Sequence, residues 1–431
     1  MAVLKPFRGY RYSEEKFGKD RIGALFAPPY DVISERLQEK LRQDPLNIVH
    51  VTLGKTNGNY EKAARLFRSW IDRGEIIQEE KPAFYIYEQI YRLNPEDDVR
   101  VRTGFVGLVR LEEFEKKIIM PHEKTMPKYS LDRLELLKVT GGNLEQIFGI
   151  YNDASGEIER LLEKSKTEEN LLIDFIDCQE IRHRIWSMTA AGDINTVRRV
   201  MNPRTLIIAD GHHRYETSLM YRREIRKKLD DPLEEIPEDL VMMTLVNLKN
   251  PGLLVLPTHR LVHDLPVNTL EGFLDRCRTY CEVIPFSDQE AMENFLAGSP
   301  KRTFGVYIKP QNVWAALTLR EVSVMDRLLG RENVNRYLDT SILHELILKK
   351  ILGIDEDMQA NNVDYLKGTK DVYAVAREDN HYQLVFVMKP TPIEDIEQAV
   401  AHAQRMPQKS SYFYPKVWTG LVMRLLEERA R

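Results

Sequence analysis

Two apolar segments joined by a short polar turn constrain the fold most strongly. Residues 83–93 ("AFYIYEQIYRL") and 103–111 ("TGFVGLVRL") are rich in aromatic and β-branched side chains, and "NPEDDVRVR" separates them. Two such segments on either side of a polar turn predict paired strands. Hairpin-linked strands are antiparallel, so this region favours an antiparallel arrangement over a doubly wound parallel sheet.

The rest of the sequence mixes strands and helices without a strict βαβ repeat. Further strands are expected at 146–151, 205–209, 242–248, 303–308, 313–319, 372–376 and 383–389. Helices are expected at 60–73, 131–139, 157–164, 180–202, 271–280, 341–352 and 393–403, and after an N-cap at Ser34. The pattern predicts an α+β fold with mixed, largely antiparallel sheets and flanking helices. A length of 431 residues exceeds one core, so we expect an N-terminal region, 1–265, and a C-terminal region, 266–431.

Composition excludes several classes of protein. A net charge of −4 argues against a nucleic-acid binder that works by bulk positive charge. No apolar run is long enough to span a bilayer, and the N-terminus lacks a signal-peptide core, so a soluble cytoplasmic protein is expected. Cys178, Cys277 and Cys281 lack the paired spacing of a zinc ribbon and are expected to be reduced thiols.

The most informative polar cluster lies between a predicted strand and a predicted helix. The apolar run 205–209 ends in Asp210, Gly211, His212, His213 and Arg214. Free backbone amides at a helix N-terminus, together with the helix dipole, favour an anion and especially phosphate. Gly211 permits close backbone approach, Arg214 can bind two phosphate oxygens, and either histidine can add a donor. This turn is therefore the predicted phosphate site.

Asp210 does not suit direct contact with phosphate. It suits coordination of a Mg²⁺ ion that bridges phosphates, or acceptance of a proton from a hydroxyl group. Zinc hydrolysis is the weaker alternative, because His212 and His213 are adjacent and point in different directions, and no His-Glu-x-x-His motif occurs. Asp210 is thus predicted as both a catalytic and a metal-binding residue.

Other loops carry similar chemistry. "MPHEKTMPK" supplies His122, Lys124, Thr125 and Lys128, and "MPQKSSYFYPK" supplies Lys409 and Ser410; both suit anions. Asp31 follows the rigid Pro28-Pro29 pair, where it can serve as acid or base. Thr258, His259 and Arg260 follow an apolar strand, and a structural polar cluster explains them better. The sequence has no Walker loop, Rossmann glycine triplet, protein-kinase catalytic loop or Gly-x-Ser-x-Gly motif, so phosphoryl chemistry would need another fold.

Several of these segments resemble a known family. "FAPPYDVIS", "PHEKTMPKYSLDRLELLKVTGGNLEQIFGIY", "ADGHHRYETSL" and "MPQKSSYFYPK" resemble, in that order, a bacterial and archaeal family catalogued as a domain of unknown function. "ADGHHRYETSL" also resembles the Asp-Gly-His-His-Arg box of free-serine kinases with the ParB/sulfiredoxin-like fold. The resemblance implies a catalytic core of that fold with large insertions.

The resemblance also implies an activity, which is phosphorylation of free L-serine to O-phospho-L-serine. The expected donor is pyrophosphate or an adenine nucleotide, ATP or ADP, with Mg²⁺ as cofactor, and a homo-oligomer is a further expectation. Asp210 would be the catalytic or metal-organising acid, with His212, His213 and Arg214 as phosphate binders. The long interval between Asp31 and Asp210 departs from the compact kinase arrangement, which leaves the general base open. The alternative is a non-catalytic, ParB-like nucleotide-binding or DNA-associated regulator.

Overall fold

The computed structural model describes residues 1–56, 58–124, 127–229, 235–368 and 372–426, without the side chains of 127–130 and 267. The chain folds into two compact units, and neither is a single continuous segment. Unit 1 contains residues 1–121, 125–254 and 415–431. Unit 2 contains residues 122–124 and 255–414. Each unit is described by itself below.

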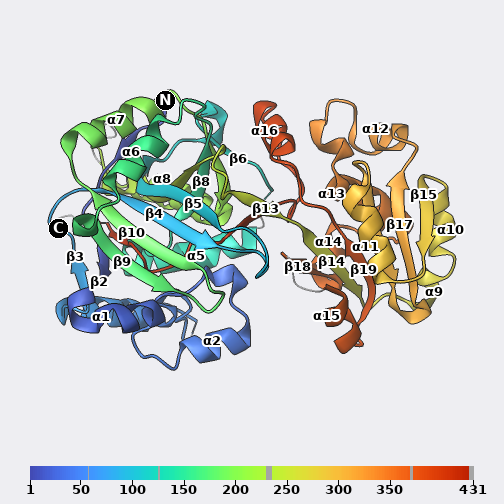
Figure 1. The fold of residues 1–431 in the computed structure, drawn as a ribbon, viewed down its shortest axis with the longest axis horizontal. Coiled ribbons are helices and arrows are strands. Elements are labelled where there is room, and N and C mark those ends of the chain that lie inside the picture. Colours follow the sequence, from blue (N-terminus) through green and yellow to red (C-terminus); the bar gives the residue numbers. More distant parts are fainter. Residues whose placement is uncertain (57, 125–126, 230–234, 369–371, 427–431) are drawn as a thin grey trace. The chain divides into compact units, whose positions relative to one another are not determined.

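Unit 1 is built on a nine-stranded mixed sheet in the order β6-β11-β8-β12-β5-β4-β10-β9, with β1 paired to β5 (Figure 1). Its strands are β1 (Leu4–Lys5), β4 (Phe84–Tyr91), β5 (Arg100–Arg110), β6 (Ile119–Pro121), β8 (Ile147–Tyr151), β9 (Leu171–Ile176), β10 (Arg182–Met188), β11 (Leu206–Asp210) and β12 (Leu240–Asn247). Only β11 with β6 and β12 with β8 pair in parallel among the described pairs. The predicted hairpin is β4 and β5, so the largely antiparallel character is confirmed.

The helices of unit 1 are α1 (Glu14–Ile22), α2 (Glu35–Leu41), α3 (Val49–Thr52), α4 (Glu61–Asp72), α5 (Pro127–Thr140), α6 (Glu157–Ser165), α7 (Ala191–Met201) and α8 (His212–Arg226). Ser34 caps α2 as predicted, because its hydroxyl accepts a hydrogen bond from the amide of Leu37. Leu206 and Ile208 of β11 are fully buried in the core together with Tyr215 of α8. The strand and the helix on either side of residues 210–211 are therefore held by packing on a common core.

Two short sheets complete unit 1, pairing β2 (Tyr10–Tyr12) with β3 (Ile76–Gln78) and β7 (Gly142–Asn143) with β21 (Arg424–Leu425). The second pairing belongs to a C-terminal segment that returns to this unit. Thr419 exchanges backbone hydrogen bonds with Ala27, and the amide of Met423 donates to the carbonyl of Tyr10 at 2.8 Å. Residues 419–425 are thus hydrogen-bonded to the N-terminal residues and to β7 within unit 1.

Unit 2 contains an antiparallel six-stranded sheet in the order β15-β17-β16-β19-β14-β18. Its strands are β14 (Thr258–His263), β15 (Cys281–Phe286), β16 (Thr303–Ile308), β17 (Val313–Leu319), β18 (Val363–Lys367) and β19 (Tyr382–Val387), and β13 (Leu254–Leu256) pairs separately with β20 (Tyr412–Tyr414). Its helices are α9 (Val267–Leu270), α10 (Phe273–Arg278), α11 (Gln289–Gly298), α12 (Ser323–Leu329), α13 (Asp339–Ser341), α14 (Glu356–Asn362), α15 (Val372–Glu378) and α16 (Ile393–Ala401), with a π-helix, η8 (Ile342–Ile351).

Alternate residues of the strands in unit 2 enter two separate cores. Leu384 and Phe386 pack with α10, α12 and η8, whereas Val385 and Val387 pack with α11 and α15. Because successive side chains of a strand point to opposite faces, this sheet is covered by helices on both sides (Figure 1). A strand that is buried on both faces has apolar residues at successive positions. This pattern allowed strands to be predicted at 303–308 and 313–319.

Two predicted elements were wrong. Residues 180–202 were expected to be mainly helical, but they form β10 and then α7. Strand β10 pairs with β4 on one side and β9 on the other, and the side chains of His183 and Ile185 are buried. Pairing with two strands here overrides the local preference for a helix. Residues 372–376 were expected to be a strand, but they belong to α15, where Val372 and Ala376 pack on the sheet from successive turns.

Candidate functional site

The predicted phosphate turn lies at the end of a buried strand of unit 1. Strand β11 ends at Asp210, and α8 begins at His212. Gly211, between them, has φ 85°, in the left-handed region that costs other residues free energy. His212 and His213 form the first turn of α8, and both are partly buried. The strand–turn–helix geometry expected from the sequence is present.

Asp210 binds two cationic side chains. Its Oδ1 accepts a hydrogen bond from Nζ of Lys416 at 2.9 Å. Its Oδ2 accepts one from a terminal nitrogen of Arg214 at 3.4 Å. The side chains of Lys416 and Arg214 are only 9% and 13% exposed, so both charges are largely removed from water. A charge pair at this depth is stronger than one at the surface, and each partner depends on the other.

Arg214 is fixed by more than the carboxylate of Asp210. Its other terminal nitrogen donates to the carbonyl of Gln146 at 2.6 Å, and its Nε lies 3.9 Å from Oε2 of Glu145. Burial lowers the pKa of Arg214, but the carboxylates of Glu145, Asp210 and Asp31 outweigh it and raise that pKa above its ordinary value. A Cβ at Gly211 would lie 2.9 Å from the guanidinium of Arg214. The glycine therefore leaves room for the arginine.

A second arginine and a tyrosine from the N-terminal segment lie near Arg214. The ring of Tyr30 stacks under the guanidinium of Arg133, which lies 4.5 Å from the ring centre. Burial raises the pKa of Tyr30, while Arg214 lowers it and Asp31 raises it. Glu145 accepts a hydrogen bond from the hydroxyl of Thr419 at 3.3 Å. Tyr30 and Glu145 thus both lie within electrostatic reach of Arg133 and Arg214.

Asp31 lies in a 3₁₀ turn, Tyr30–Val32, and its side chain is exposed. It influences the pKa of both Tyr30 and Arg214, so it belongs to the same electrostatic neighbourhood as Asp210. Rigid Pro29 precedes the turn in an extended conformation, as the sequence indicated. Of the two predicted acids, Asp210 thus contacts Arg214, and Asp31 is close enough to raise the pKa of Arg214 despite its separation in the sequence.

The carboxylates near Arg214 are ligands of the type that Mg²⁺ prefers, but they do not form one of the described groups of three whose ligand atoms lie within 4.8 Å of one another. Mg²⁺ prefers oxygen ligands and is usually held by one or two carboxylates together with substrate phosphates. Asp210, Glu145 and Asp31 supply carboxylates, and Arg214 and Lys416 supply donors for phosphate oxygens. The donor set contains no thiolate, and the carboxylates match a hard cation. Binding of Mg²⁺ stays a proposal.

A second polar cluster lies in unit 2. Nε2 of His122 lies 2.6 Å from the hydroxyl of Ser411, whose Oγ also donates to Oε1 of Glu123 at 2.9 Å. Oε2 of Glu123 accepts from the backbone amide of Lys409 at 3.2 Å. His122 is completely buried, with its ring edge-on to Phe413. The two loops predicted to bind anions, around His122 and Lys409, therefore meet within this unit.

Arg260 contacts the same loop as this cluster, through the backbone of Lys409. It is completely buried, and it donates to the carbonyl of Lys409 at 3.0 Å. Burial lowers the pKa of Arg260 to about 10. Ser410 is buried too, and its hydroxyl donates to the carbonyl of Pro407 and contacts that of Thr340. Burial of His259 and Arg260 agrees with their interpretation as a structural cluster, and Arg260 holds the loop of Lys409 and Ser410 in place.

The remaining residues of the predicted anion loop are placed only in part. The amide of Lys124 donates to the carbonyl of Met406 at 3.2 Å, and its side chain is exposed. Thr125 lies outside the described residues, and Lys128 is in α5 with no described side chain. Phosphate binding by His122, Lys124, Thr125, Lys128, Lys409 and Ser410 stays a prediction.

One metal-type cluster of three residues occurs among the described histidines, cysteines and acids. It consists of His263, Asp264 and His381 in unit 2, whose ligand atoms lie within 4.8 Å of one another. Cys178, Cys277 and Cys281 are free, and burial raises the pKa of the Cys281 thiol to about 12. No helix in the described part of the chain is long and apolar enough to cross a membrane.

Sequence reasoning missed part of the Asp210 neighbourhood. Lys416 is the last residue of "MPQKSSYFYPK", from which only Lys409 and Ser410 were selected as site residues, but it pairs with Asp210. Glu145, Arg133 and Tyr30 had no assigned role, although all lie in segments whose resemblance to a family had been noticed. That resemblance was the available signal, because no local periodicity marks a charged residue as the partner of a distant one.

The family model described as "Protein of unknown function (DUF1015)" matches residues 4–341. The chain belongs to this family. The match confirms the resemblance noticed in the sequence. Among curated proteins, none matches the sequence.

Several solved structures are distantly similar. A free serine kinase in complex with AMP is 14% identical, with a TM-score of 0.35, over 71% of this chain and 86% of that chain. A conserved hypothetical protein from Pyrococcus furiosus is 15% identical, with a TM-score of 0.34, over 71% and 89%. C-terminally truncated SbnI from Staphylococcus aureus is 9% identical, with a TM-score of 0.35, over 73% and 85%. These values describe a distant likeness, so function is inferred from the residues of the site.

Proposed function

We propose that this protein is a small-molecule phosphotransferase whose phosphoryl site is the Asp210 turn. The pairing of Asp210 with both Arg214 and Lys416, at the N-terminus of α8, carries the proposal. The helix N-terminus and two cations suit transferring phosphate oxygens, and the acid suits the accepting hydroxyl or a bridging cation.

Free L-serine is the proposed acceptor and pyrophosphate or ATP/ADP the proposed donor, on the resemblance of "ADGHHRYETSL" to free-serine kinases. The serine hydroxyl oxygen forms a bond to the terminal phosphorus of the donor, and the bond from that phosphorus to the leaving oxygen breaks. The hydroxyl proton passes to a carboxylate, for which Asp210 and Asp31 are the candidates. Mg²⁺ bound by Asp210 and the phosphates would neutralise charge that develops on the donor.

Arg214 and Lys416 have complementary roles in this proposal. The planar guanidinium of Arg214 is held by the carbonyl of Gln146, which leaves it oriented toward Asp210. A guanidinium held in this way can exchange its carboxylate contact for two phosphate oxygens. Lys416 supplies a compact charge on the other oxygen of Asp210. Binding of the donor would therefore release Asp210 for the acceptor or for the cation.

The direct test uses isotopically labelled L-serine. The protein, Mg²⁺ and ¹⁵N-labelled L-serine are incubated separately with ATP, ADP or pyrophosphate, and labelled phosphoserine is measured by mass spectrometry. We expect product with at least one donor, and about a hundredfold less or lower still with Asp210→Asn. Nucleotide binding without product from serine or other small alcohols would contradict the proposal and support the alternative, a non-catalytic nucleotide-binding regulator. Retention on DNA that is steeply sensitive to salt would support the DNA-associated form of that alternative.

A further inference from the structure

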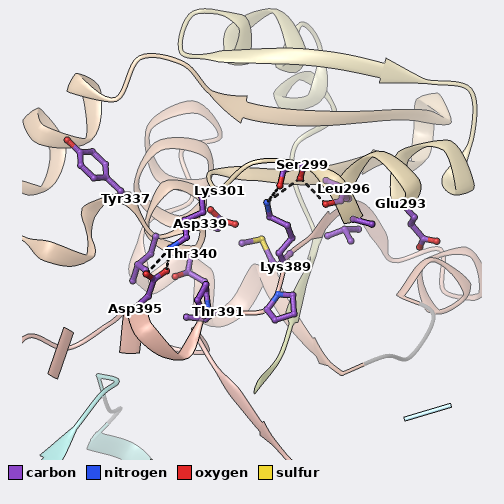
Figure 2. Close-up of a pocket in the computed structure, with 16 residues that line it drawn as sticks. Glu293, Leu296, Ser299, Lys301, Tyr337, Asp339, Thr340, Lys389, Thr391 and Asp395 are labelled. Carbon is purple, nitrogen blue, oxygen red and sulfur yellow. Dashed lines mark hydrogen bonds and ion pairs between the residues drawn. The ribbon is translucent and has the colours of Figure 1, made fainter. Parts of the chain in front are cut away.

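A cavity in unit 2 has the features of a small-molecule site. Its volume is about 510 Å³, within the usual range for ligand pockets. Leu296, Leu338, Val387 and Met388 provide an apolar wall. Polar side chains also line the cavity, and the charged ones are Glu293, Lys301, Asp339, Lys389 and Asp395 (Figure 2). Asp339 lies at the start of α13 and Lys389 just after β19. A specific ligand site commonly combines an apolar wall with polar groups that fix the orientation of the ligand.

Two opposite charges lie in this cavity without pairing. Each is close enough to shift the pKa of the other, yet no ion pair joins Asp339 and Lys389 among the described residues. Two other charged residues at the cavity do form an ion pair, in which Nζ of Lys301 lies 3.0 Å from Oδ1 of Asp395 (dashed lines in Figure 2). Burial raises the pKa of Asp339 and lowers that of Lys389. Both effects are those of charges that have lost water without gaining a full partner.

Asp339 has hydrogen-bonding capacity for a ligand, whereas Lys389 already contacts three neutral acceptors. Oδ1 of Asp339 accepts from the amide of Arg302 at 2.7 Å, and its other oxygen has no hydrogen-bond partner among the described residues. Nζ of Lys389, which is partly buried, donates to the carbonyl and hydroxyl of Ser299 (Figure 2) and to the carbonyl of Pro300. These acceptors are neutral and use all three N–H groups of the ammonium, so a ligand carboxylate would replace one of them. The exchange would give Lys389 a partner of opposite charge.

The backbone around Asp339 has two uncommon features. Arg302, which donates its amide to Asp339, has φ 67°, in the left-handed region. The short helix that begins at Asp339 continues directly into the π-helix η8 (Ile342–Ile351). Both features cost free energy, and both occur preferentially at ligand and functional sites. They hold the carboxylate of Asp339 at the cavity wall.

We propose that this cavity binds a free α-amino acid with an apolar side chain. The ammonium group contacts Asp339, the carboxylate contacts Lys389, and the side chain lies against Leu296, Val387 and Met388. In an α-amino acid the ammonium and the carboxylate are attached to the same carbon. Asp339 and Lys389 line the same cavity, so one such ligand can contact both. Serine has little apolar surface to bury against Leu296, Val387 and Met388, so it should bind here only weakly. The site is independent of the proposed phosphotransferase activity.

Calorimetric titration of the full chain tests the proposal, with L-leucine, L-methionine and L-phenylalanine as probes. Isocaproate, which is leucine without the amino group, and isoamylamine, which is leucine without the carboxylate, test each charge separately. We expect at least one of the three amino acids to bind. We expect the two leucine analogues to bind at least about tenfold more weakly, since each charged hydrogen bond contributes about that factor or more. We expect the same of L-serine, because it lacks the apolar side chain that would be buried against the wall.

Two variants locate the binding. Asp339→Asn can still accept the Arg302 amide but loses its charge, and Lys389→Met keeps the length of the side chain. Each should weaken binding about tenfold to a hundredfold. Exposed Asp275→Asn and Lys349→Met, which change the same groups outside the cavity, should bind as the parent does.

Three results would overturn the proposal. The first is absence of binding by all three apolar amino acids at millimolar concentration in protein whose fold is verified by circular dichroism. The second is equal binding by isocaproate or isoamylamine, which would show that one of the charges has no role. The third is unchanged affinity in Asp339→Asn. The analogue series needs no variant, so it decides the matter even if a substitution prevents folding.

Discussion

Nζ of Lys416 lies 2.9 Å from Oδ1 of Asp210, although 206 positions separate the two residues. The contact joins the C-terminal segment of the chain to the end of β11 in unit 1. Because both side chains are largely buried, the pair contributes to the position of Asp210 as well as to its charge. The lysine therefore has to be considered in every test of this turn.

We predict that Asp210→Asn lowers turnover by roughly two to four orders of magnitude, the usual scale for loss of a general acid or base. The same change removes the carboxylate that pairs with Lys416 and leaves Arg214 with Glu145 as its ion-pair partner, so the free energy of unfolding should also fall, by about 1–3 kcal/mol. Phosphoserine formation and urea unfolding measure the two effects. Asp239→Asn is the matched control, because Asp239 pairs with Arg226 in the same unit, away from the turn. The Asp239→Asn variant should be less stable than the parent and should have the same turnover. Near-normal turnover in Asp210→Asn would exclude a catalytic role for Asp210.

We predict that Arg214→Lys weakens binding of the phosphoryl donor strongly although the charge is retained. A guanidinium can hold the Gln146 carbonyl and a phosphate together, whereas an ammonium lacks the planar fork. Calorimetric titration with each donor measures the effect. Arg223→Lys, in the same helix but exposed and paired with Glu113, should leave donor affinity unchanged. Equal donor affinity in the two variants would assign Arg214 a purely structural role.

We predict that the phosphotransferase activity requires Mg²⁺. The carboxylates of Asp210, Glu145 and Asp31 gather around one arginine, and an added phosphate would bring more negative charge to them. Activity should disappear in excess EDTA and return when Mg²⁺ is added above the chelator concentration. Full turnover in EDTA, with metal content verified by elemental analysis, would reject this requirement.

Gly211→Ala should destabilise the protein and displace Arg214. The backbone is in the left-handed region, and the added methyl carbon would lie 2.9 Å from the guanidinium. The free energy of unfolding should fall by about 1–2 kcal/mol. Gly192→Ala, in α7 with no atom near the new methyl group, is the control and should be neutral or slightly stabilising. Equal stability of the two variants would mean that residue 211 tolerates a side chain.

The stability of the protein should fall between pH 6.5 and pH 4 in part because of His259. Burial, assisted by the charge of Arg260, lowers the pKa of His259 from 6.5 to about 4. As the pH falls, the unfolded chain therefore takes up a proton on this histidine before the folded chain does, which favours unfolding. The free energy of unfolding is thus unaffected by this group above pH 6.5 and decreases as the pH falls toward 4. The full effect of this group is about 3 kcal/mol. Urea unfolding across this range should show a smaller pH dependence for His259→Gln; an unchanged dependence would contradict the assignment.

Local sequence patterns were sufficient for the strand, turn and helix around Asp210. An apolar run, a glycine and a following amphipathic segment are short-range features, and their geometry follows from backbone preferences that any neighbouring structure has to accept. The same holds for the β4–β5 hairpin and for the apolar strands of unit 2, whose composition reflects burial on both faces.

Tertiary pairing decided the elements that the sequence predicted wrongly. Residues 182–188 carry enough helix-compatible side chains to continue the pattern of α7, but pairing with β4 and β9 makes them a strand. Residues 372–376 have β-branched side chains, but packing against the sheet makes them helical. Local preferences are worth a fraction of a kcal/mol per residue, and burial of one large apolar side chain outweighs several of them.

The sequence by itself determined which residue types stand at the strand end, and hence that the turn suits an anion. The tertiary structure alone decided which distant charges accompany it. Lys416 joins Asp210, Glu145 and Asp31 join Arg214, and His122 joins Ser411 because sheet order and the return of the C-terminal segment bring these positions together. Charged side chains have no periodicity that encodes a partner hundreds of positions away, so their pairing follows from the packing of the apolar core.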